Sequence, residues 1–411
     1  MYNYKEKRYI FTNTAKKTYT FYYDENLGLC YNTLNKYNSW NPPISLQKNI
    51  HPFFYIDMDF NDMFHIIFQD KHGNLYYSFM ENSKISTVAL LKSKFYAYYN
   101  KYPFLIKINS AVYFFFIIHH NDKLMLSYQL FSDNKVTTPK VIDYVPEVQI
   151  PYKAIYNNQN SIYIFYQNTC ENFLQIGYKE YYLTTKKWTD YNPVTNQNSN
   201  AEFPRIILDN KNILHLIYQR KIDKQFDLVY KHKVSSKSIW SDEKVFCSSS
   251  SNFLNSSISL VNKILFAYWL RENNIYFRYS KDSGTNWSPT SKNSLSNKKH
   301  IFCAEYKTNN PSETKKTCAQ EIPANYNNGF NIAFLNNYND FEDGNISNKD
   351  SKKIDTDTFS TLKENIEDLK KNNHLLKEEI KSLKNSLKTM GIEITKNQVR
   401  ISLLENKKHP H

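Results

Sequence analysis

The sequence predicts an all-β propeller that is followed by a long α-helical coiled coil. A strand-rich unit recurs six times along the first part of the chain, and the last part carries an unbroken heptad pattern. The composition agrees with a β-rich body, because aromatic residues make up 16% of the chain and fit the half-buried surface of a strand. We expect the propeller to cover residues 1–336.

One tyrosine marks each repeat, and successive marker tyrosines are 46 to 52 residues apart. Each lies in a strand-like phrase such as MLSYQ or DLVYK, and another phrase such as HIIFQ or HLIYQ precedes it. An apolar run comes before that phrase, and a weaker fourth stretch follows the tyrosine. Four short strands per unit are typical of a propeller blade, so the tyrosines are expected where blades pack together. They are Tyr31, Tyr77, Tyr128, Tyr178, Tyr230 and Tyr279.

Two further stretches bear on how the ring closes. Residues 300–309 and 330–336 resemble the first two strands of another unit, with a polar insertion containing Pro311 and Pro323 between them. They either join the N-terminal strand or begin a seventh blade. The sequence therefore predicts six four-stranded blades and leaves a seventh open. With only 7 glycines in the chain, turns must be built from Asn, Asp, Lys and Ser.

An eight-residue motif stands in the sixth repeat, where Ser280, Asp282, Gly284 and Trp287 follow the spacing S-x-D-x-G-x-x-W. The aspartate suits capping of backbone N–H groups in the turn between the third and fourth strands. The glycine suits a positive φ, and the tryptophan suits packing between sheets. Tryptophans at the matching stretch of three other repeats are Trp40, Trp188 and Trp240.

This motif is the Asp-box, and the chain resembles a degenerate member of the sialidase/BNR (Asp-box) repeat β-propeller superfamily over about residues 8–335. The resemblance implies the fold and a structural role for the four motif residues. For a sialidase it also implies three arginines on the substrate carboxylate and a Tyr–Glu nucleophile. The expected F-R-I-P phrase is missing; the nearest phrases contain Arg8 and Arg205. An arginine triad would draw on Arg8, Arg205 or Arg220, and Arg271.

Two other groups of residues could form a metal site or a catalytic carboxylate pair, but structural roles explain them better. His65 and His215 occupy equivalent positions in two repeats, which favours packed positions over a metal site. Asp57 and Asp59 share a strand face and are expected to be solvated at a strand end. We therefore predict no catalytic residues, no metal site and no cofactor.

The charge and cysteine content restrict partners and location. A formal net charge of +14 comes almost entirely from evenly spread lysines, so specific nucleic-acid binding is not expected. The odd count of 5 cysteines argues against a disulfide framework. The start of the chain lacks a signal-peptide pattern, and no apolar run is long enough to span a membrane. We expect a cytoplasmic protein, with signal-independent release or surface assembly left open.

The C-terminal part begins with a polar segment, residues 337–357, which is expected to be a disordered linker. Residues 358–406 then carry seven heptads that predict a parallel coiled coil, and residues 407–411 a disordered tail. This predicts self-association as a homodimer or homotrimer. The predicted core positions are Phe359, Leu362, Ile366, Leu369, Asn373, Leu376, Ile380, Leu383, Leu387, Met390, Ile394, Asn397, Ile401 and Leu404.

These features favour a non-catalytic binding or scaffold protein that presents several propellers at once to a glycan or a surface polymer. A sialidase-like glycoside hydrolase is the alternative that the resemblance implies. A structural component of a spore, phage or surface layer is a second alternative, in which the coiled coil is the assembly device.

Overall fold

The computed structural model describes residues 7–334 and, further on, Glu378 and Ser382. The gaps in the first range are residues 82–83, 95, 97–98, 158–159, 235–238, 254, 272–273, 294–301, 315–316, 319–320, 326–330 and 333. The chain divides into a unit of residues 1–339 and a unit of residues 340–411. Glu378 and Ser382 are helical. The predicted linker, the coiled-coil core from Phe359 to Leu404 and the tail lie outside the described residues, so the coiled coil stays a prediction.

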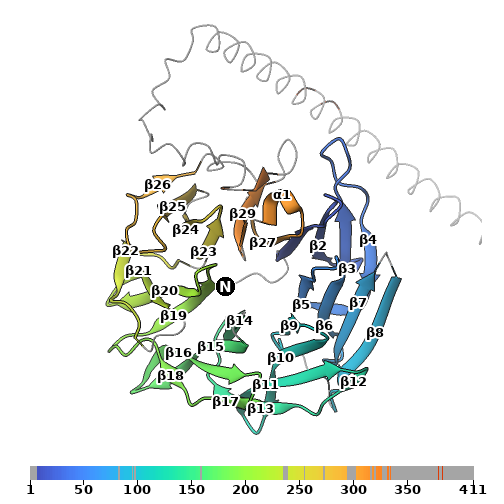
Figure 1. Ribbon diagram of the computed structural model, residues 1–411, viewed down its shortest axis with the longest axis horizontal. Helices are drawn as coiled ribbons and strands as arrows, with labels where there is room; N and C mark the ends of the chain where they lie inside the picture. The colour runs from blue at the N-terminus through green and yellow to red at the C-terminus, as the bar shows by residue number, and fades with distance from the viewer. Residues whose placement is uncertain are drawn as a thin grey trace, which may run out of the picture. The chain divides into compact units, whose positions relative to one another are not determined.

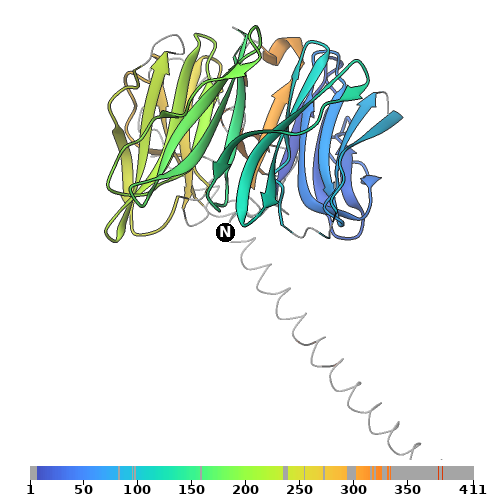
Figure 2. The ribbon, with the colours of Figure 1, turned by 90° about the horizontal axis from the view of Figure 1, so that it is seen from below.

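The first unit is a six-bladed β-propeller. Its described strands form six sheets, and Figure 1 shows them arranged as a ring around a central axis. Seen from the side in Figure 2, the strands run between the two faces of the ring. Neighbouring strands within a blade are antiparallel, as expected for consecutive strands joined by short turns.

Blades 1 to 3 cover residues 8–145. Blade 1 contains β1 (Arg8–Thr12), β2 (Thr18–Asp24), β3 (Gly28–Thr33) and β4 (Ile44–Gln47). Blade 2 contains β5 (Ile50–Met58), β6 (Phe64–Asp70), β7 (Leu75–Glu81) and β8 (Lys84–Leu91). Blade 3 contains β9 (Phe104–Ile108), β10 (Ala111–His120), β11 (Lys123–Ser132), β12 (Lys135–Val136) and β13 (Lys140–Val145).

Blades 4 to 6 follow in chain order. Blade 4 contains β14 (Tyr152–Asn157), β15 (Ser161–Cys170), β16 (Phe173–Tyr182), β17 (Lys187–Trp188) and β18 (Asn192–Pro193). Blade 5 contains β19 (Ala201–Leu208), β20 (Ile213–Ile222), β21 (Gln225–Val234) and β22 (Lys244–Ser249). Blade 6 contains β23 (Ser257–Val261), β24 (Ile264–Arg271), β25 (Asn274–Ser280), β26 (Ser291–Lys292) and, from the end of the unit, β28 (Thr317–Cys318).

The ring closes on the N-terminal strand, which is one of the two outcomes that the sequence left open. Strand β27 (Phe302–Thr308) pairs in parallel with β1, and β29 (Ile322–Asn325) and β30 (Asn331–Ile332) extend the same sheet. The short helix α1 (Pro311–Thr314) follows β27. These closing strands lie between blades 6 and 1 in Figure 1. Pro323, expected in a polar insertion, lies within β29.

Asparagine and aspartate build the tight turns, as the scarcity of glycine predicts. Between the second and third strands of blades 3 and 4, Asn121, Asp122 and Asn172 have positive φ angles of 48°, 58° and 71°. Short polar side chains tolerate this left-handed region better than other residues with a Cβ atom. The hairpins therefore form with few glycines.

The hydrophobic core is divided into layers between neighbouring blades. One layer joins blades 3 and 4 through Phe115 and Ile164, and another joins blades 5 and 6 through Tyr230 and Trp269. Among the six marker tyrosines, five are at most 8% exposed, and each lies on the third strand of its blade. Tyr279 is half-buried instead. Blade 6 is followed by the closing strands, and Phe334 stacks on Phe266 there at 4.4 Å between ring centroids.

Buried glutamines connect successive blades. Gln69 Oε1 accepts a hydrogen bond of 2.9 Å from Lys101 N, and Gln219 Oε1 accepts one of 2.7 Å from Phe253 N. Gln167 Nε2 donates to the carbonyl oxygen of Ala201 at 2.9 Å. Each glutamine lies on the second strand of its blade and binds backbone at or near the start of the next blade. Because these backbone groups are buried, each bond offsets an otherwise costly desolvation.

Candidate functional site

The first strands of the blades line the central channel and form a cavity where they begin. The cavity has a volume of about 90 Å³. Its wall includes Tyr55 on β5, Phe104 on β9, Lys153 on β14 and Arg205 on β19. Residues from both ends of the propeller domain complete it: Lys7 precedes β1, Glu305 lies on β27 and Glu321 precedes β29. Ring closure therefore builds this site.

Aromatic rings form one side of the cavity. Tyr55 and Phe104 lie with their ring centroids 4.0 Å apart, and Tyr152 meets Phe104 edge-on at 6.5 Å. Tyr152 donates a hydrogen bond to the carbonyl oxygen of Tyr102, which fixes both residues at the cavity wall. Rings held in this way can stack on the apolar faces of a flat or cyclic ligand.

Ion pairs cross the cavity, and the closing segment supplies their carboxylates. Arg205 Nε lies 3.0 Å from Glu321 Oε2. Glu305 Oε1 lies 3.1 Å from Lys7 Nζ and 3.8 Å from Lys153 Nζ. Charges placed in a partly buried site interact more strongly than they do in bulk water. These pairs therefore hold the closing strands against blades 4 and 5.

Burial and charge shift the pKa values of three cavity residues. Burial raises the pKa of the Tyr55 hydroxyl well above its usual value, and the nearby Glu305 adds to the shift, so this phenol stays protonated. Burial also lowers the pKa of Lys153, although Glu305 opposes it. Burial acts to raise the pKa of Glu321, but Arg205 and the lysines outweigh it, and the net pKa is lowered.

A second cavity lies where the first strands end, and it is larger, with a volume of about 380 Å³. Lys307 on β27 pairs with Asp57 on β5 at 2.7 Å in its wall. Phe60, in the turn after β5, also lines it and is 91% exposed. This cavity shares Tyr55, Phe104, Lys153 and Glu305 with the first one, so the two cavities meet at these four residues.

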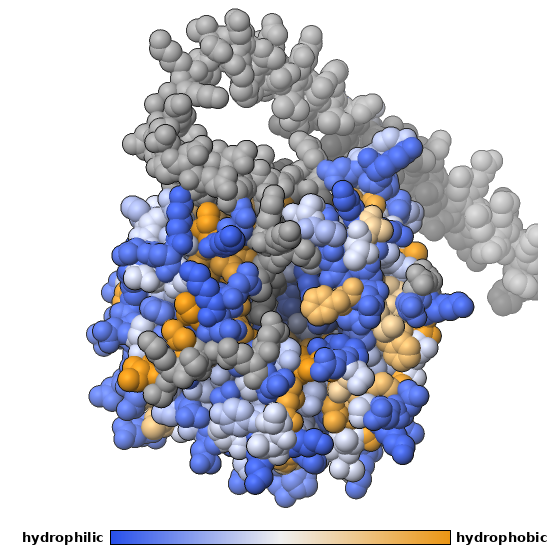
Figure 3. All heavy atoms as spheres, viewed as in Figure 1, coloured by the Kyte–Doolittle hydropathy of each residue, from blue (hydrophilic) through white to orange (hydrophobic). Residues whose placement is uncertain are grey.

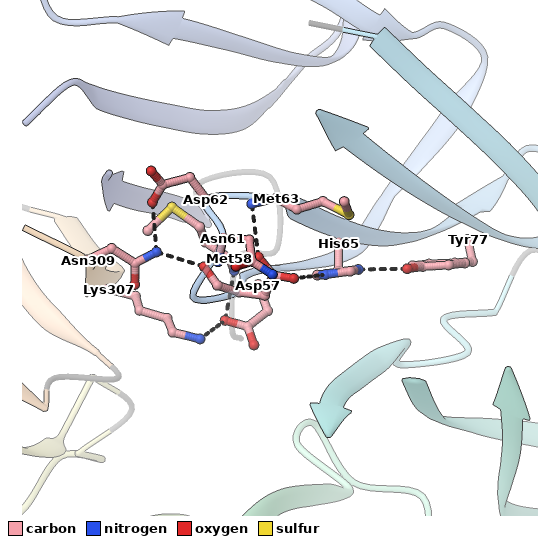
Figure 4. A network of polar contacts seen from close by, with 10 residues as sticks. Asp57, Met58, Asn61, Asp62, Met63, His65, Tyr77, Lys307 and Asn309 are labelled. Carbon is pink, nitrogen blue, oxygen red and sulfur yellow. Dashed lines mark hydrogen bonds and ion pairs between the residues drawn. The ribbon is translucent and has the colours of Figure 1, made fainter. Parts of the chain in front are cut away.

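A polar network joins the closing strand to the β5–β6 turn, as Figure 4 shows. Asn309 Nδ2 donates to the carbonyl oxygen of Asp59 at 2.7 Å and to Asp62 Oδ1 at 2.8 Å. Asp59 also accepts hydrogen bonds from the backbone N–H groups of Asn61 and Met63. Asp57 and Asp59 therefore do not act together as a carboxylate pair, because one neutralises a lysine and the other caps a turn.

His65 and His215 lie in matching, fully partnered sets. His215 Nε2 donates to Asp209 Oδ2 at 3.2 Å, and its Nδ1 lies 2.8 Å from the Tyr230 hydroxyl. In blade 2, His65 makes the same contacts with Asp59 at 3.2 Å and with Tyr77 at 2.6 Å. Burial lowers the pKa of both imidazoles, which favours the neutral ring that accepts from tyrosine. Both histidines are structural in this arrangement.

The motif residues of blade 6 lie at the end of β25 and in the turn that follows it, and none of them lines either cavity. Ser280 Oγ donates to Asp282 Oδ1 at 2.7 Å and accepts from Gly284 N at 2.9 Å. Gly284 has φ +88°, and a Cβ atom there would lie 1.8 Å from the Tyr230 hydroxyl. Trp287 packs against Tyr230 at 4.9 Å between ring centroids. The turn thus rests on the histidine set of blade 5.

The arginines do not gather at one place in the described part of the chain. Arg205 is the one arginine among the described residues that line the two cavities. Arg8 stacks on the Tyr22 ring at 4.6 Å. Arg220 pairs with Glu243 and Asp227 within blade 5. The triad that the sialidase resemblance implies is therefore not assembled among these residues.

The described residues also bear on metal binding and on membrane insertion. No group of three His, Cys, Asp or Glu side chains in that part of the chain is placed to hold a metal ion. Within the same residues, no helix has the length and apolar character needed to cross a membrane. The face of the propeller shown in Figure 3 is mainly hydrophilic, and its apolar side chains form small separate groups. The two cavities of the channel are the candidate site because they bring aromatic rings and charged side chains together.

Comparison with known proteins identifies the fold. No protein-family profile and no curated protein sequence matches the chain. Among solved structures, a PL25 ulvan lyase bound to a GlcA–Rha3S saccharide superposes with a TM-score of 0.54 at 12% identity, covering 77% of this chain and 88% of the lyase. At this identity, the likeness shows the propeller fold alone.

Two further structures are similar at lower scores. A variant of the Aleuria aurantia lectin in complex with Fucα1-6GlcNAc has a TM-score of 0.45 and 10% identity, and the match covers 72% of this chain and 98% of the lectin. The Penicillium chrysogenum α-L-arabinanase complexed with arabinobiose has a TM-score of 0.42 and 8% identity, with 59% and 80% covered. Scores this low support no functional argument.

Proposed function

We propose that this protein is a non-catalytic glycan-binding propeller and that the central channel holds the ligand. The observation that carries the proposal is the junction of the two cavities, where Tyr55 and Phe104 stand beside Lys153 and Glu305. Aromatic faces and fixed polar groups in one concave site are the means by which proteins bind polar cyclic ligands. A saccharide offers both a C–H face for the rings and hydroxyl groups for the charged side chains.

The protonation states of the polar groups in the channel also favour binding of a saccharide over its hydrolysis. Glu321 is paired with Arg205, and its lowered pKa keeps it ionised near neutral pH, so it is a poor general acid. Tyr55 keeps its proton because burial raises its pKa. A hydroxyl donor and ionised carboxylate acceptors of this kind bind sugar hydroxyls without reacting with them.

Binding to a microarray of plant, bacterial and animal glycans, followed by calorimetry on the ligands found, tests the proposal. We expect Phe104→Ala to weaken binding at least about tenfold, because the ring forms the shared wall of both cavities. Tyr37→Ala is the matched control, since Tyr37 is 78% exposed and lies outside both cavities. Equal loss in the two variants, or no bound glycan, would contradict the channel as the site.

The proposal extends to self-association through residues 358–406, which would bring two or three propellers together and raise affinity for a repetitive glycan. Light scattering on the full chain and on residues 1–339 tests this. We expect the full chain to have a mass two or three times that of its 48.9 kDa protomer and the shorter chain to be monomeric. A monomeric full chain would exclude the coiled coil.

A sialidase-like hydrolase is the second candidate, and one observation favours it. Tyr55 and Glu305 lie side by side in the channel with Arg205 in the same cavity. The purified protein should nevertheless leave a fluorogenic sialoside intact under our proposal. Turnover that is lost in Tyr55→Phe and kept in Tyr37→Phe would establish the enzyme instead.

A further inference from the structure

The described walls of the channel contain more cationic side chains than carboxylates. The described walls of the two cavities together contain four cationic side chains and three carboxylates. Each carboxylate has one close cationic partner: Lys7 for Glu305 at 3.1 Å, Arg205 for Glu321 at 3.0 Å and Lys307 for Asp57 at 2.7 Å. The fourth cation is Lys153.

Lys153 lies where the two cavities meet, and among the described residues its ammonium group has no carboxylate oxygen within hydrogen-bond distance. Its nearest carboxylate oxygen among the described residues is Glu305 Oε1 at 3.8 Å, the same atom that Lys7 approaches more closely. That distance is beyond a hydrogen bond. An ammonium group has three N–H donors, and burying it without acceptors is costly.

Two aromatic rings flank this ammonium group. Lys153 Nζ lies 5.0 Å from the ring centroid of Phe104 and 5.9 Å from that of Tyr55. Such contacts partly stabilise a cation but accept no hydrogen bond of ordinary strength. Only 17% of the Lys153 side chain is exposed, so water compensates for it less than it would at the surface.

We infer that the channel binds a saccharide unit that carries a negative charge, as carboxylate or sulfate, and that Lys153 is the cation that pairs with it. The inference rests on the proposed function and names the ligand class for the same site. An anionic group beside Lys153 would complete the charge balance of the wall. Glu305 and Glu321 would repel it only weakly, because Lys7 and Arg205 neutralise them.

The geometry also assigns the surrounding contacts. Phe104 and Tyr55 lie next to Lys153, so the ring of the charged sugar would stack there while its anionic oxygen reaches the ammonium group. The larger cavity extends from this point to the exposed Phe60, which leaves room for a neighbouring unit of the same chain. A saccharide longer than one unit should therefore bind more tightly than a monosaccharide.

Calorimetry on the full chain with three tetrasaccharides tests the inference. The probes are a hyaluronan tetrasaccharide with carboxylates, a carrageenan tetrasaccharide with sulfates and the neutral chitotetraose. We expect at least one anionic probe to bind about tenfold or more tightly than chitotetraose, as a charge-assisted hydrogen bond in a buried site allows. The two anionic probes tell carboxylate recognition from sulfate recognition.

Variants separate the site from the general positive charge of the protein. Lys153→Met should abolish the preference for the anionic probe, whereas Lys153→Arg should keep most of it. Lys211→Met, at an exposed position in the β19–β20 turn, should leave all affinities unchanged. Thermal unfolding of each variant checks that the fold is intact.

The outcomes distinguish the proposed glycan binding from the proposed role of Lys153 in binding an anionic saccharide. If chitotetraose binds as tightly as the anionic probes, or if Lys153→Met keeps the anionic preference, glycan binding stands and the role of Lys153 is wrong. If none of the three tetrasaccharides binds, the inference is wrong, and the glycan microarray then decides whether the proposed function stands.

Discussion

His65 in blade 2 and His215 in blade 5 each have a partner on both ring nitrogens, whereas around the channel one carboxylate lies near two lysines. His215 lies between Asp209 and Tyr230, and none of its side chain is exposed. Glu305, by contrast, faces both Lys7 and Lys153 from the channel wall. Both regions are polar and largely buried, but of His65, His215 and Lys153 only the two histidines have a close partner among the described residues for every polar side-chain atom.

This difference distinguishes residues that stabilise the fold from residues that can bind a ligand. A buried polar set whose donors and acceptors are all partnered stabilises one conformation and has no capacity left for a ligand. An ammonium group in a cavity, with N–H donors that have no close carboxylate among the described residues, can still bind a ligand. The same residue types therefore play opposite roles in the two regions, according to how many partners surround them.

The largest expected effect is a loss of stability when Asp209, the carboxylate partner of His215, is removed. Asp209 accepts hydrogen bonds from the N–H groups of Lys211 and Ile213 as well as from His215. Asp209→Ala leaves these donors without their acceptor and should lower the free energy of unfolding by about 3 kcal/mol. The more exposed Asp59→Ala should cost less, about 2 kcal/mol. Urea unfolding measures both.

Asp242→Ala is the control for this experiment, because Asp242 is exposed. A cost for Asp209→Ala no greater than that of the control would contradict the structural role of the set.

The second expected effect is a pH dependence of the free energy of unfolding near neutral pH, which the two buried histidines cause and the channel does not. The pKa values of His65 and His215 are lowered from 6.5 by burial, so the unfolded chain binds protons first as the pH falls. Their contribution to stability is present above pH 6.5 and is lost as the pH falls toward the folded-state pKa. We expect a loss of about 1 kcal/mol between pH 7.5 and 5.5 from urea unfolding, and a smaller one in His215→Gln.

The channel should respond in a different pH range. The pKa of Glu321 is lowered from 4.5 by Arg205 and the nearby lysines, against the opposing effect of burial. Its contribution is therefore present above pH 4.5 and is lost only at lower pH. A pH profile without a separate loss above pH 5.5 would show that the histidine sets do not titrate as described.

The smallest expected effect is at the channel. Lys153→Met removes a charge that has no carboxylate within hydrogen-bond distance among the described residues, and it keeps the aliphatic length of the side chain. We expect the free energy of unfolding to change by less than about 0.5 kcal/mol, because the lost attraction and the relieved desolvation nearly cancel. Urea unfolding measures it beside Asp209→Ala. A loss as large as that of Asp209→Ala would make Lys153 a structural residue and remove the contrast.

Local sequence patterns predicted most of the propeller. The spacing of the marker tyrosines placed the third strand of every blade, and phrases such as HLIYQ placed the second. Residues 300–309 were expected to form a strand, and β27 occupies most of that range. These predictions succeeded because strand formation and blade packing depend on short patterns of apolar residues, which repeat with the blades.

Two structural devices were visible in the sequence but were not recognised. An aspartate stands six residues before each of His65 and His215, and the marker tyrosine of the same repeat completes the set. A glutamine ends the phrases HIIFQ, YIFYQ and HLIYQ, and each of these glutamines binds the next blade. Both devices recur at fixed positions relative to the second-strand phrases, so the polar residues of the repeats indicate them as the aromatic residues indicate the strands.

The sequence by itself determined the six-fold repeat and the consecutive strands that the blades share, whereas the fifth strands of blades 3, 4 and 6 were not predicted. Only the tertiary structure decided that β27 joins β1 and that Lys7, Lys153, Arg205, Glu305 and Glu321 meet in one channel. The reason is physical. Strand patterns are local, whereas these five residues come from four separate parts of the chain and are brought together only when the ring closes.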